Sequence, residues 1–109
     1  MITRPENLIC VKREIEFNLR IYKVLEIDLA HINKNGRANY LVTDVMEIVQ
    51  VILDGVVLES VEYKLYGKEY CDSFIQTGKH KQKRYKIVLC VCSDRPNSIG
   101  IITLHRLKG

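Results

Sequence analysis

The clearest structural signal in the chain is the segment Tyr85–Cys92, which reads Tyr-Lys-Ile-Val-Leu-Cys-Val-Cys. Successive side chains of an extended strand point to opposite faces, so the odd-numbered apolar residues share one face and the even-numbered residues share the other. A turn signal follows within Ser93–Ser98, and Ile99–Arg106 then predicts a second strand. Because strands joined by short turns pair side by side, the sequence predicts an antiparallel sheet in the C-terminal half.

The segments before this pair predict further strands and one helix. Val56–Tyr63 and Glu69–Gln76 are short strand-like runs bounded by turn residues. Asp44–Leu53 carries apolar residues at helical spacing, and Thr43-Asp44 before it offers an N-cap and an acidic first turn. Gly55 stands where a left-handed helix cap would be needed. We therefore expect a helix over Asp44–Leu53, followed by strands.

The N-terminal region leaves two interpretations open. Glu14–Leu29 has apolar residues at nearly every odd position, which favours a strand, but a helical stripe can be drawn through the same segment. We favour at least one strand near Tyr22–Asp28, and Asn35-Gly36 then signals a turn. The predicted fold is therefore α+β, with one or two N-terminal helical elements packed on an antiparallel sheet of about four strands.

The composition indicates one globular domain spanning residues 1–109. Hydrophobic residues make up 47% and charged residues 28% of the chain, which excludes wholesale disorder. The chain has no apolar run of about 18 residues, so no transmembrane helix is expected. Met1–Asn7 lacks the apolar segment of a secretory signal, and we therefore expect a cytoplasmic protein without a membrane partner.

The four cysteines are Cys10, Cys71, Cys90 and Cys92. Because nothing marks the chain as secreted, the sequence predicts reduced thiols rather than disulfides. Cys90 and Cys92 would share one strand face, and both are best interpreted as small, buried apolar side chains. A zinc site would require a second ligand pair at a matching spacing, and none is present, so we expect neither a metal nor another cofactor.

The charge of the chain is strongly segregated. The net charge is +4, but residues 79–109 contain eight basic residues and one acid, which gives +7, while residues 1–78 carry −3. Such a basic segment predicts a polyanionic partner, with phosphate backbones as the commonest, or alternatively a solvated loop without a partner. The expected contacts are the basic residues of this segment, with one tyrosine for stacking on a base: Lys79, Lys81, Lys83, Arg84, Tyr85, Lys86 and Arg95.

The last predicted strand carries a candidate catalytic histidine. Strict alternation over Ile99–Leu107 places Ile101, Thr103 and His105 on one face and Ile102, Leu104 and Arg106 on the other. Cleavage of RNA without a metal needs an acid or base and cations for the phosphoryl oxygens. His105 would be the acid or base, Arg106 and Arg84 the stabilising cations, and the loop Lys79–Lys83 the backbone clamp. Lys86 would replace Arg106 if Arg106 faces the covered side. The alternative is that His105 is an ordinary surface residue.

A second group of polar residues precedes the predicted helix. His31 and Arg37 could form another cationic corner of a site, or they could cap turns and bind carbonyl groups. His80 lies in the basic segment Lys79–Arg84 and would contribute charge there.

The ordered series His31, Arg37, Thr43-Asp44-Val45, Leu53-Asp54-Gly55 and Ile101–Arg106 resembles a family of small bacterial domains grouped with RelE-type toxins. The resemblance spans roughly Asp28 to Arg106 and does not extend to Met1–Ile27. It implies a RelE-like fold, an endoribonuclease that acts on messenger RNA, often at the ribosome, and a neutralising antitoxin partner. It also implies site roles for Thr103, His105 and Arg106, with His31 and Arg37 opposite them.

Three functions are consistent with these patterns. The first is a RelE-like, metal-independent endoribonuclease of the messenger-RNA-cleaving toxin type. The second is a non-catalytic regulator from a phage or mobile element that binds nucleic acid or protein. The third is a structural domain whose C-terminal charge serves solubility.

Overall fold

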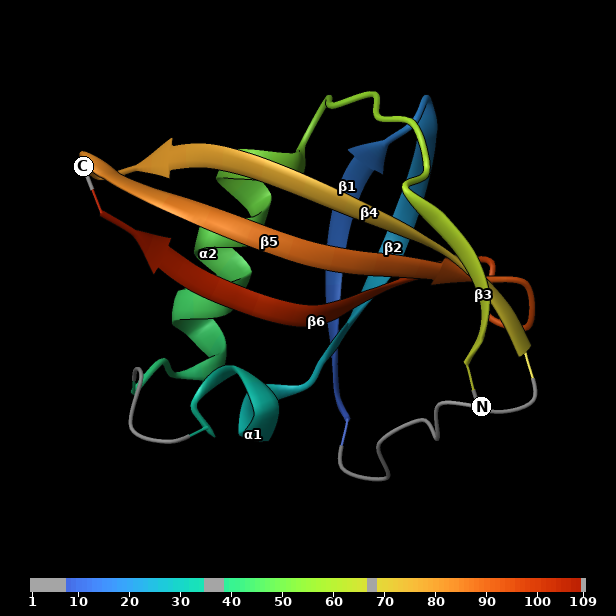
Figure 1. Ribbon diagram of the computed structural model, residues 1–109, viewed down its shortest axis with the longest axis horizontal. Helices are drawn as coiled ribbons and strands as arrows, with labels where there is room; N and C mark the ends of the chain where they lie inside the picture. Colours follow the sequence, from blue (N-terminus) through green and yellow to red (C-terminus); the bar gives the residue numbers. More distant parts are fainter. Residues whose placement is uncertain (1–7, 35–38, 67–68, 109) are drawn as a thin grey trace.

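The computed structural model describes residues 8–34, 39–66 and 69–108, which form one six-stranded sheet and two helices (Figure 1). The spatial order of the strands is β1-β2-β6-β5-β4-β3. The helices are α1 (Leu29–Ile32) and α2 (Val42–Leu53). The strands are β1 (Ile9–Phe17), β2 (Arg20–Ile27), β3 (Glu62–Tyr66), β4 (Glu69–His80), β5 (Lys83–Cys92) and β6 (Ser98–Leu107).

The sheet is mixed, and the prediction of helices packed on about four antiparallel strands is wrong. β2 pairs with β6 in the parallel direction, with Leu25 opposite Ile99 and Ile27 opposite Ile101, whereas the other pairs are antiparallel. A parallel pair requires a long crossover, and here both helices and β3–β5 lie between β2 and β6 in the chain. The N-terminal strands and β3 enlarge the sheet, so strand is the dominant structure and helix the minor one.

The N-terminal alternation belongs to a β-hairpin. β1 and β2 pair from Ile9 opposite Ile27 to Phe17 opposite Arg20. The two turn residues, Asn18 and Leu19, have φ angles of 52° and 64°, the left-handed region that a tight two-residue hairpin turn requires. Such turns usually contain glycine, and this one does not, so it could not be predicted from turn residues.

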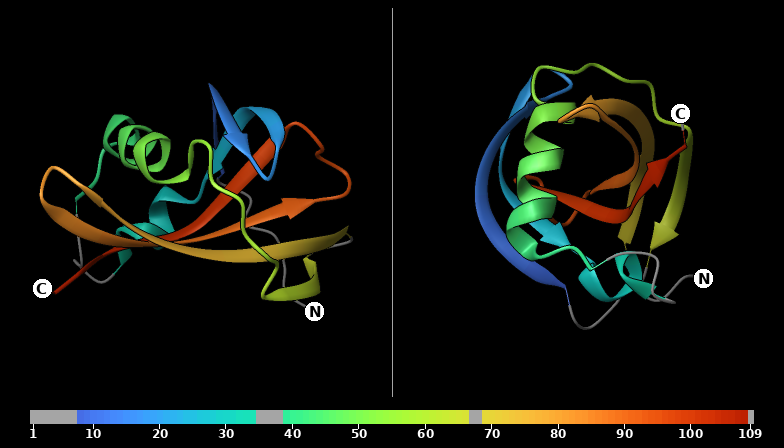
Figure 2. Two further views of the ribbon diagram at one scale, coloured as in Figure 1. Left: turned by 90° about the horizontal axis from the view of Figure 1, so that it is seen from above. Right: turned by 90° about the vertical axis from the view of Figure 1, so that its left-hand side faces the viewer.

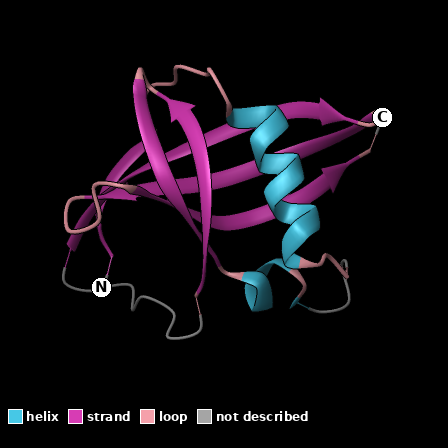
Figure 3. Cartoon of the chain, turned by 180° about the vertical axis from the view of Figure 1, so that it is seen from behind, coloured by secondary structure: helices cyan, strands magenta, loops and turns pink. Residues whose placement is uncertain are grey.

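Helix α2 lies across the inner, concave face of the sheet (Figures 2 and 3). It begins at Val42, one residue before the predicted Thr43 cap, and the Asp44 carboxylate accepts a 2.8 Å hydrogen bond from the Leu41 N–H. Its predicted end is confirmed: Gly55 follows with a φ of 80°. The Gly55 N–H donates to the Glu16 carbonyl at 2.7 Å, which ties the helix end to β1.

The core lies between α2 and the inner face of the sheet. Burying this apolar surface is the main force that holds the helix in place. The largest fully buried side chains come from β1, β2, β5, β6 and α2: Ile15, Phe17, Leu25, Ile27, Val45, Val49, Leu53, Ile87, Leu89, Ile99, Ile101 and Leu104. The predicted alternation of Tyr85–Cys92 is confirmed, because its odd-numbered residues face this core.

Two predicted segments differ in the structure. Val56–Tyr63 is mostly an irregular connection, and β3 begins only at Glu62. Leu58 N–H donates to the Asn18 side chain, so the connection is held by side-chain and backbone hydrogen bonds instead of a strand ladder. The predicted loop Lys79–Lys83 is a tight hairpin between β4 and β5, with only Lys81 and Gln82 in the turn, both at positive φ.

β6 contains a bulge that breaks its alternation. Val88 pairs with Thr103, but the next residue of β5, Leu89, pairs with Ile101, so Ile102 is the extra residue. Ile101 therefore faces the core, while Thr103 lies on the other face. The prediction that these two residues share a face is wrong.

The prediction of reduced cysteines is wrong for two of the four. Cys71 of β4 and Cys92 of β5 lie directly opposite each other and form a disulfide. Cys10 and Cys90 are not disulfide-bonded, and Cys90 is buried. The prediction that Cys90 and Cys92 share one face is confirmed. None of the described helices is both long and apolar enough to cross a membrane.

One close approach between sheet and helix is testable. A Cβ atom on Gly78 would lie 2.8 Å from the Ile52 methyl carbon of α2. We predict that Gly78→Ala lowers the free energy of unfolding by about 1–3 kcal/mol, because α2 must move away from β4. Urea denaturation measures the loss, and Thr77→Ala, at an exposed neighbouring position, is the control. Equal midpoints for the two variants would show that α2 does not pack this closely.

Candidate nucleic-acid interface

The outer face of the sheet, opposite α2, carries a group of basic side chains at the free ends of β4, β5 and β6. Lys79 lies directly opposite Arg84, and Lys86 lies directly opposite His105. Tyr85 and Ile87 face the core, so the alternate residues Arg84 and Lys86 face outward. Their cross-strand partners share that outer face. We call Lys79, Arg84, Lys86 and His105 the cationic face. Figure 1 views the sheet from this side, with α2 behind β5 and β6.

The cationic face has no acidic neighbours on its own strands. Neither β5 nor β6 contains an Asp or Glu residue, and β4 contains none from Ser73 onward. Within the described ranges, no ion pair engages Lys79, Arg84 or Lys86. Like charges directly opposite one another on paired strands are destabilising. The like charges on this face therefore repel one another, and a bound anion would reduce that repulsion.

His105 lies half-buried in this face, with Thr103 two residues before it on the same side of β6. The ring nitrogen Nδ1 is buried and has no hydrogen-bond partner within the described part of the chain. No carboxylate therefore orients the ring there, which is the support that a catalytic imidazole usually receives. The cation opposite His105 on the neighbouring strand is Lys86, the residue expected to replace Arg106 if Arg106 faces the covered side.

Arg106 lies on the inner side of the sheet, because it is paired with the core residue Tyr85. Its charge acts on the Tyr40 hydroxyl: burial and the nearby Tyr85 raise the pKa of Tyr40, and Arg106 opposes that rise. Arg106 also lines a hollow of about 450 Å³ at the end of the sheet, together with Lys83, Arg84 and Lys108. His105 and Arg106 therefore point away from each other, and the structure does not bring them together.

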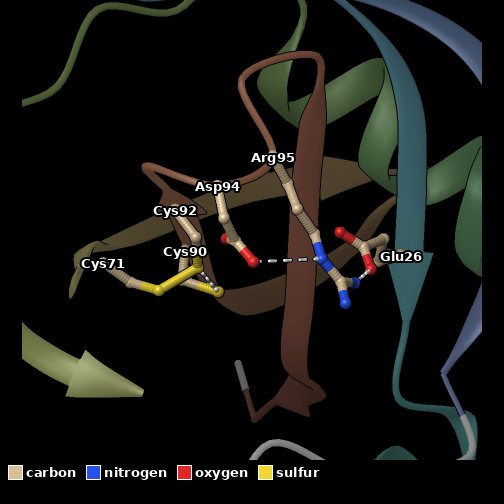
Figure 4. Close-up of a disulfide and its surroundings, with 6 residues drawn as sticks. All are labelled: Glu26, Cys71, Cys90, Cys92, Asp94 and Arg95. Atoms are coloured by element: carbon tan, nitrogen blue, oxygen red, sulfur yellow. Dashed lines mark hydrogen bonds and ion pairs between the residues drawn. A yellow bond between two sulfur atoms is a disulfide. The ribbon is translucent and has the colours of Figure 1, made fainter. Parts of the chain in front are cut away.

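Three basic residues of the C-terminal half are held by acids. The Arg95 guanidinium bonds to the buried carboxylate of Glu26 on β2, and its Nε lies 3.7 Å from Asp94 (Figure 4). His80 and Lys81 approach Glu47 of α2 at 3.3 Å and 3.4 Å. Arg95 stabilises the connection between β5 and β6, and it is not an unpaired cation. Sequence spacing cannot reveal Glu26 and Glu47 as partners, since these two acids lie far from the basic segment in the sequence.

The remaining predicted site residues are separated from the cationic face. Tyr85 is only 6% exposed and packs against Tyr40, so its ring is not available to stack on a base. His31 is exposed on α1, where its N–H donates to the Asp28 carboxylate, and no described hydrogen bond or ion pair links its side chain to His105. Arg37 lies outside the described residues.

Comparisons of the chain with protein-family models, with curated proteins and with solved structures found no match.

Proposed function

We propose that the cationic face binds the phosphate backbone of a nucleic acid, with RNA as the favoured partner. The observation that carries this proposal is the pairing of Lys79 with Arg84 and of Lys86 with His105 on an outer face whose strands carry no acid near them. Cations held on neighbouring strands present several donors to one polyanion and displace its counterions. The resemblance to RelE-type toxins favours RNA over DNA.

The mode of binding follows from the kinds of side chain on this face. Its lysine and arginine side chains are suited to phosphate oxygens, which carry no sequence information. The tyrosine of β5 that could stack on bases is buried against the core, and the accessible apolar neighbours, Ile75 and Val88, are aliphatic. We therefore propose recognition of backbone charge, with little discrimination between base sequences.

Charge reversal on the cationic face is the first test. We predict that Arg84→Glu with Lys86→Glu weakens binding to a fluorescently labelled RNA at least about tenfold. The slope of log K against log salt should fall by about two, because two phosphate contacts are lost. Fluorescence anisotropy at several salt concentrations measures both quantities, with duplex DNA of the same length as the second probe.

The matched control is Lys12→Glu with Lys23→Glu, which makes the same charge change on exposed positions of β1 and β2. The control should retain most of the affinity, since these lysines lie on other strands. An equal loss in both double variants would show that net charge, and not the cationic face, governs binding. Binding that does not change with salt would contradict the proposal.

A second candidate function is metal-independent RNA cleavage by the same face. It is favoured by one observation: His105 lies opposite Lys86, so a titratable imidazole and a permanent cation are neighbours. His105 would transfer the proton, and Lys86 would stabilise the charge on the phosphoryl oxygens. The His105 Nδ1 atom has no hydrogen-bond partner among the described residues, and Arg106 points to the opposite face, so binding is the better supported function. The antitoxin partner and the cytoplasmic location stay predictions.

Cleavage is tested with the wild-type protein in the presence of a metal chelator. If this face is catalytic, RNA is cut, His105→Ala abolishes cutting while affinity changes little, and a 2′-deoxy substitution at the cut site blocks the reaction. Gel analysis of end-labelled RNA, free or bound to ribosomes, measures the products. Intact RNA in both settings would remove the catalytic candidate and leave the binding function standing.

A further inference from the structure

Three cysteine sulfurs gather on the outer face of the sheet, at the opposite end of β5 from the cationic face. Cys71 and Cys92 form the disulfide between β4 and β5, and the Cys90 Sγ atom lies 4.0 Å from the Cys92 Sγ atom (Figure 4). Cys90 and Cys92 are two residues apart on β5 and therefore point to the same side. A reduced thiol thus lies next to a disulfide within one buried cluster.

The surroundings of Cys90 leave space for its sulfur. Gly100 of β6 lies opposite Cys90, and a Cβ atom at Gly100 would stand 2.8 Å from the Cys90 Sγ atom. A cavity of about 20 Å³ adjoins the cluster and is lined by Cys90, Cys92, Gly100 and Ile102 among others. A space of this size accommodates a water-sized group, so a sulfur atom can shift within it.

We propose that these three residues form an internal thiol–disulfide exchange site in which Cys92 is the shared sulfur. The Cys90 thiol loses its proton, and the thiolate attacks the Cys92 sulfur. A Cys90–Cys92 bond forms as the Cys92–Cys71 bond breaks, and the Cys71 thiolate takes up a proton. One disulfide and one thiol are present before and after, so no outside oxidant or reductant is consumed.

The exchange changes which elements are covalently linked. The Cys71–Cys92 disulfide joins β4 to β5, whereas a Cys90–Cys92 disulfide lies within β5 alone. Residues two apart on an extended strand have Cα atoms about 6.7 Å apart, near the upper limit for a disulfide. The cross-strand bond is therefore the major form. In the minor, exchanged form β4 stays joined to β5 through the turn at Lys81 and Gln82, but only non-covalent contacts hold the two strands together near Cys71 and Cys92.

Peptide mapping distinguishes the two forms. Trypsin places Cys71 on the peptide Glu69–Lys79 and both other residues on Ile87–Arg106, because the Arg95-Pro96 bond resists cleavage. The native protein is held at mildly alkaline pH, acid-quenched, and then denatured and alkylated. In the major form the two peptides are linked and Cys90 is alkylated. In the exchanged form Cys71 is alkylated, and the peptide Ile87–Arg106 contains an internal disulfide.

We expect alkylated Cys71 to appear in the wild type, to increase as the pH of the incubation rises, and to be lost in Cys90→Ser. Cys10→Ser, which removes the exposed thiol, should leave the distribution unchanged and so exclude exchange between molecules. Cys71→Ser should form the Cys90–Cys92 disulfide under mild oxidation. The proposal is overturned if Cys71 is never alkylated in the wild type and if Cys90 and Cys92 both stay reduced in the Cys71→Ser variant.

Discussion

The structure depends on the position of β6, which lies between the N-terminal hairpin and the C-terminal strands. β6 pairs in parallel with β2 and antiparallel with β5, so it joins two parts of the sheet that would otherwise have separate edges. The Asp28 N–H also donates to the Ile101 carbonyl, which places α1 at the end of this pairing. Without β6, neither the inner core nor the outer cationic face would be continuous.

The bulge at Ile102 determines which side chains β6 presents on each face. Before the bulge, Ile99 and Ile101 are buried beneath the helix layer, and after it Leu104 takes over that role. The change in phase brings His105 to the outer face beside Lys86 and directs Arg106 to the inner side. Alternation alone places His105 and Arg106 on opposite faces, and the extra residue determines that His105 is the one that faces outward.

The basic residues of the C-terminal half serve two different purposes. Arg95, His80 and Lys81 meet acids from β2, the neighbouring loop and α2, so their side chains are engaged within the protein. Truncating Arg95 would leave the buried Glu26 carboxylate without its partner, which is costly in a protein interior. Lys79, Arg84 and Lys86 have no such partners in the described segments, and their mutual repulsion is what makes the outer face suited to a polyanion.

The sequence predicted those elements whose pattern is local. The alternation in Tyr85–Cys92 and the cap at Gly55 depend on neighbouring residues, and both are confirmed. The β1–β2 hairpin was not predicted because its turn uses Asn18 and Leu19 at positive φ, without glycine.

Non-local features could not be predicted from the sequence, for a different reason. The parallel pairing of β2 with β6 and the partnership of Glu26 with Arg95 join residues about seventy positions apart, and no local pattern encodes them. For the candidate site, the basic segment was recognisable from composition, but the register that places Lys86 opposite His105 on the outer face depends on the bulge in β6. The bulge at Ile102 could not be anticipated, because its signal lies in the pairing with β5.

The outer face of β4, β5 and β6 is the proposed binding face of the protein. The most direct measurement is an NMR titration of the isotope-labelled protein with a short RNA, following side-chain signals that report on one face each. Shifts of the His105 ring and of the Ile75, Val88 and Thr103 methyl groups, with Leu104 and Val49 unchanged, are the predicted result. Shifts confined to Tyr40 and Arg106 on the inner side, or none at all, would contradict the claim.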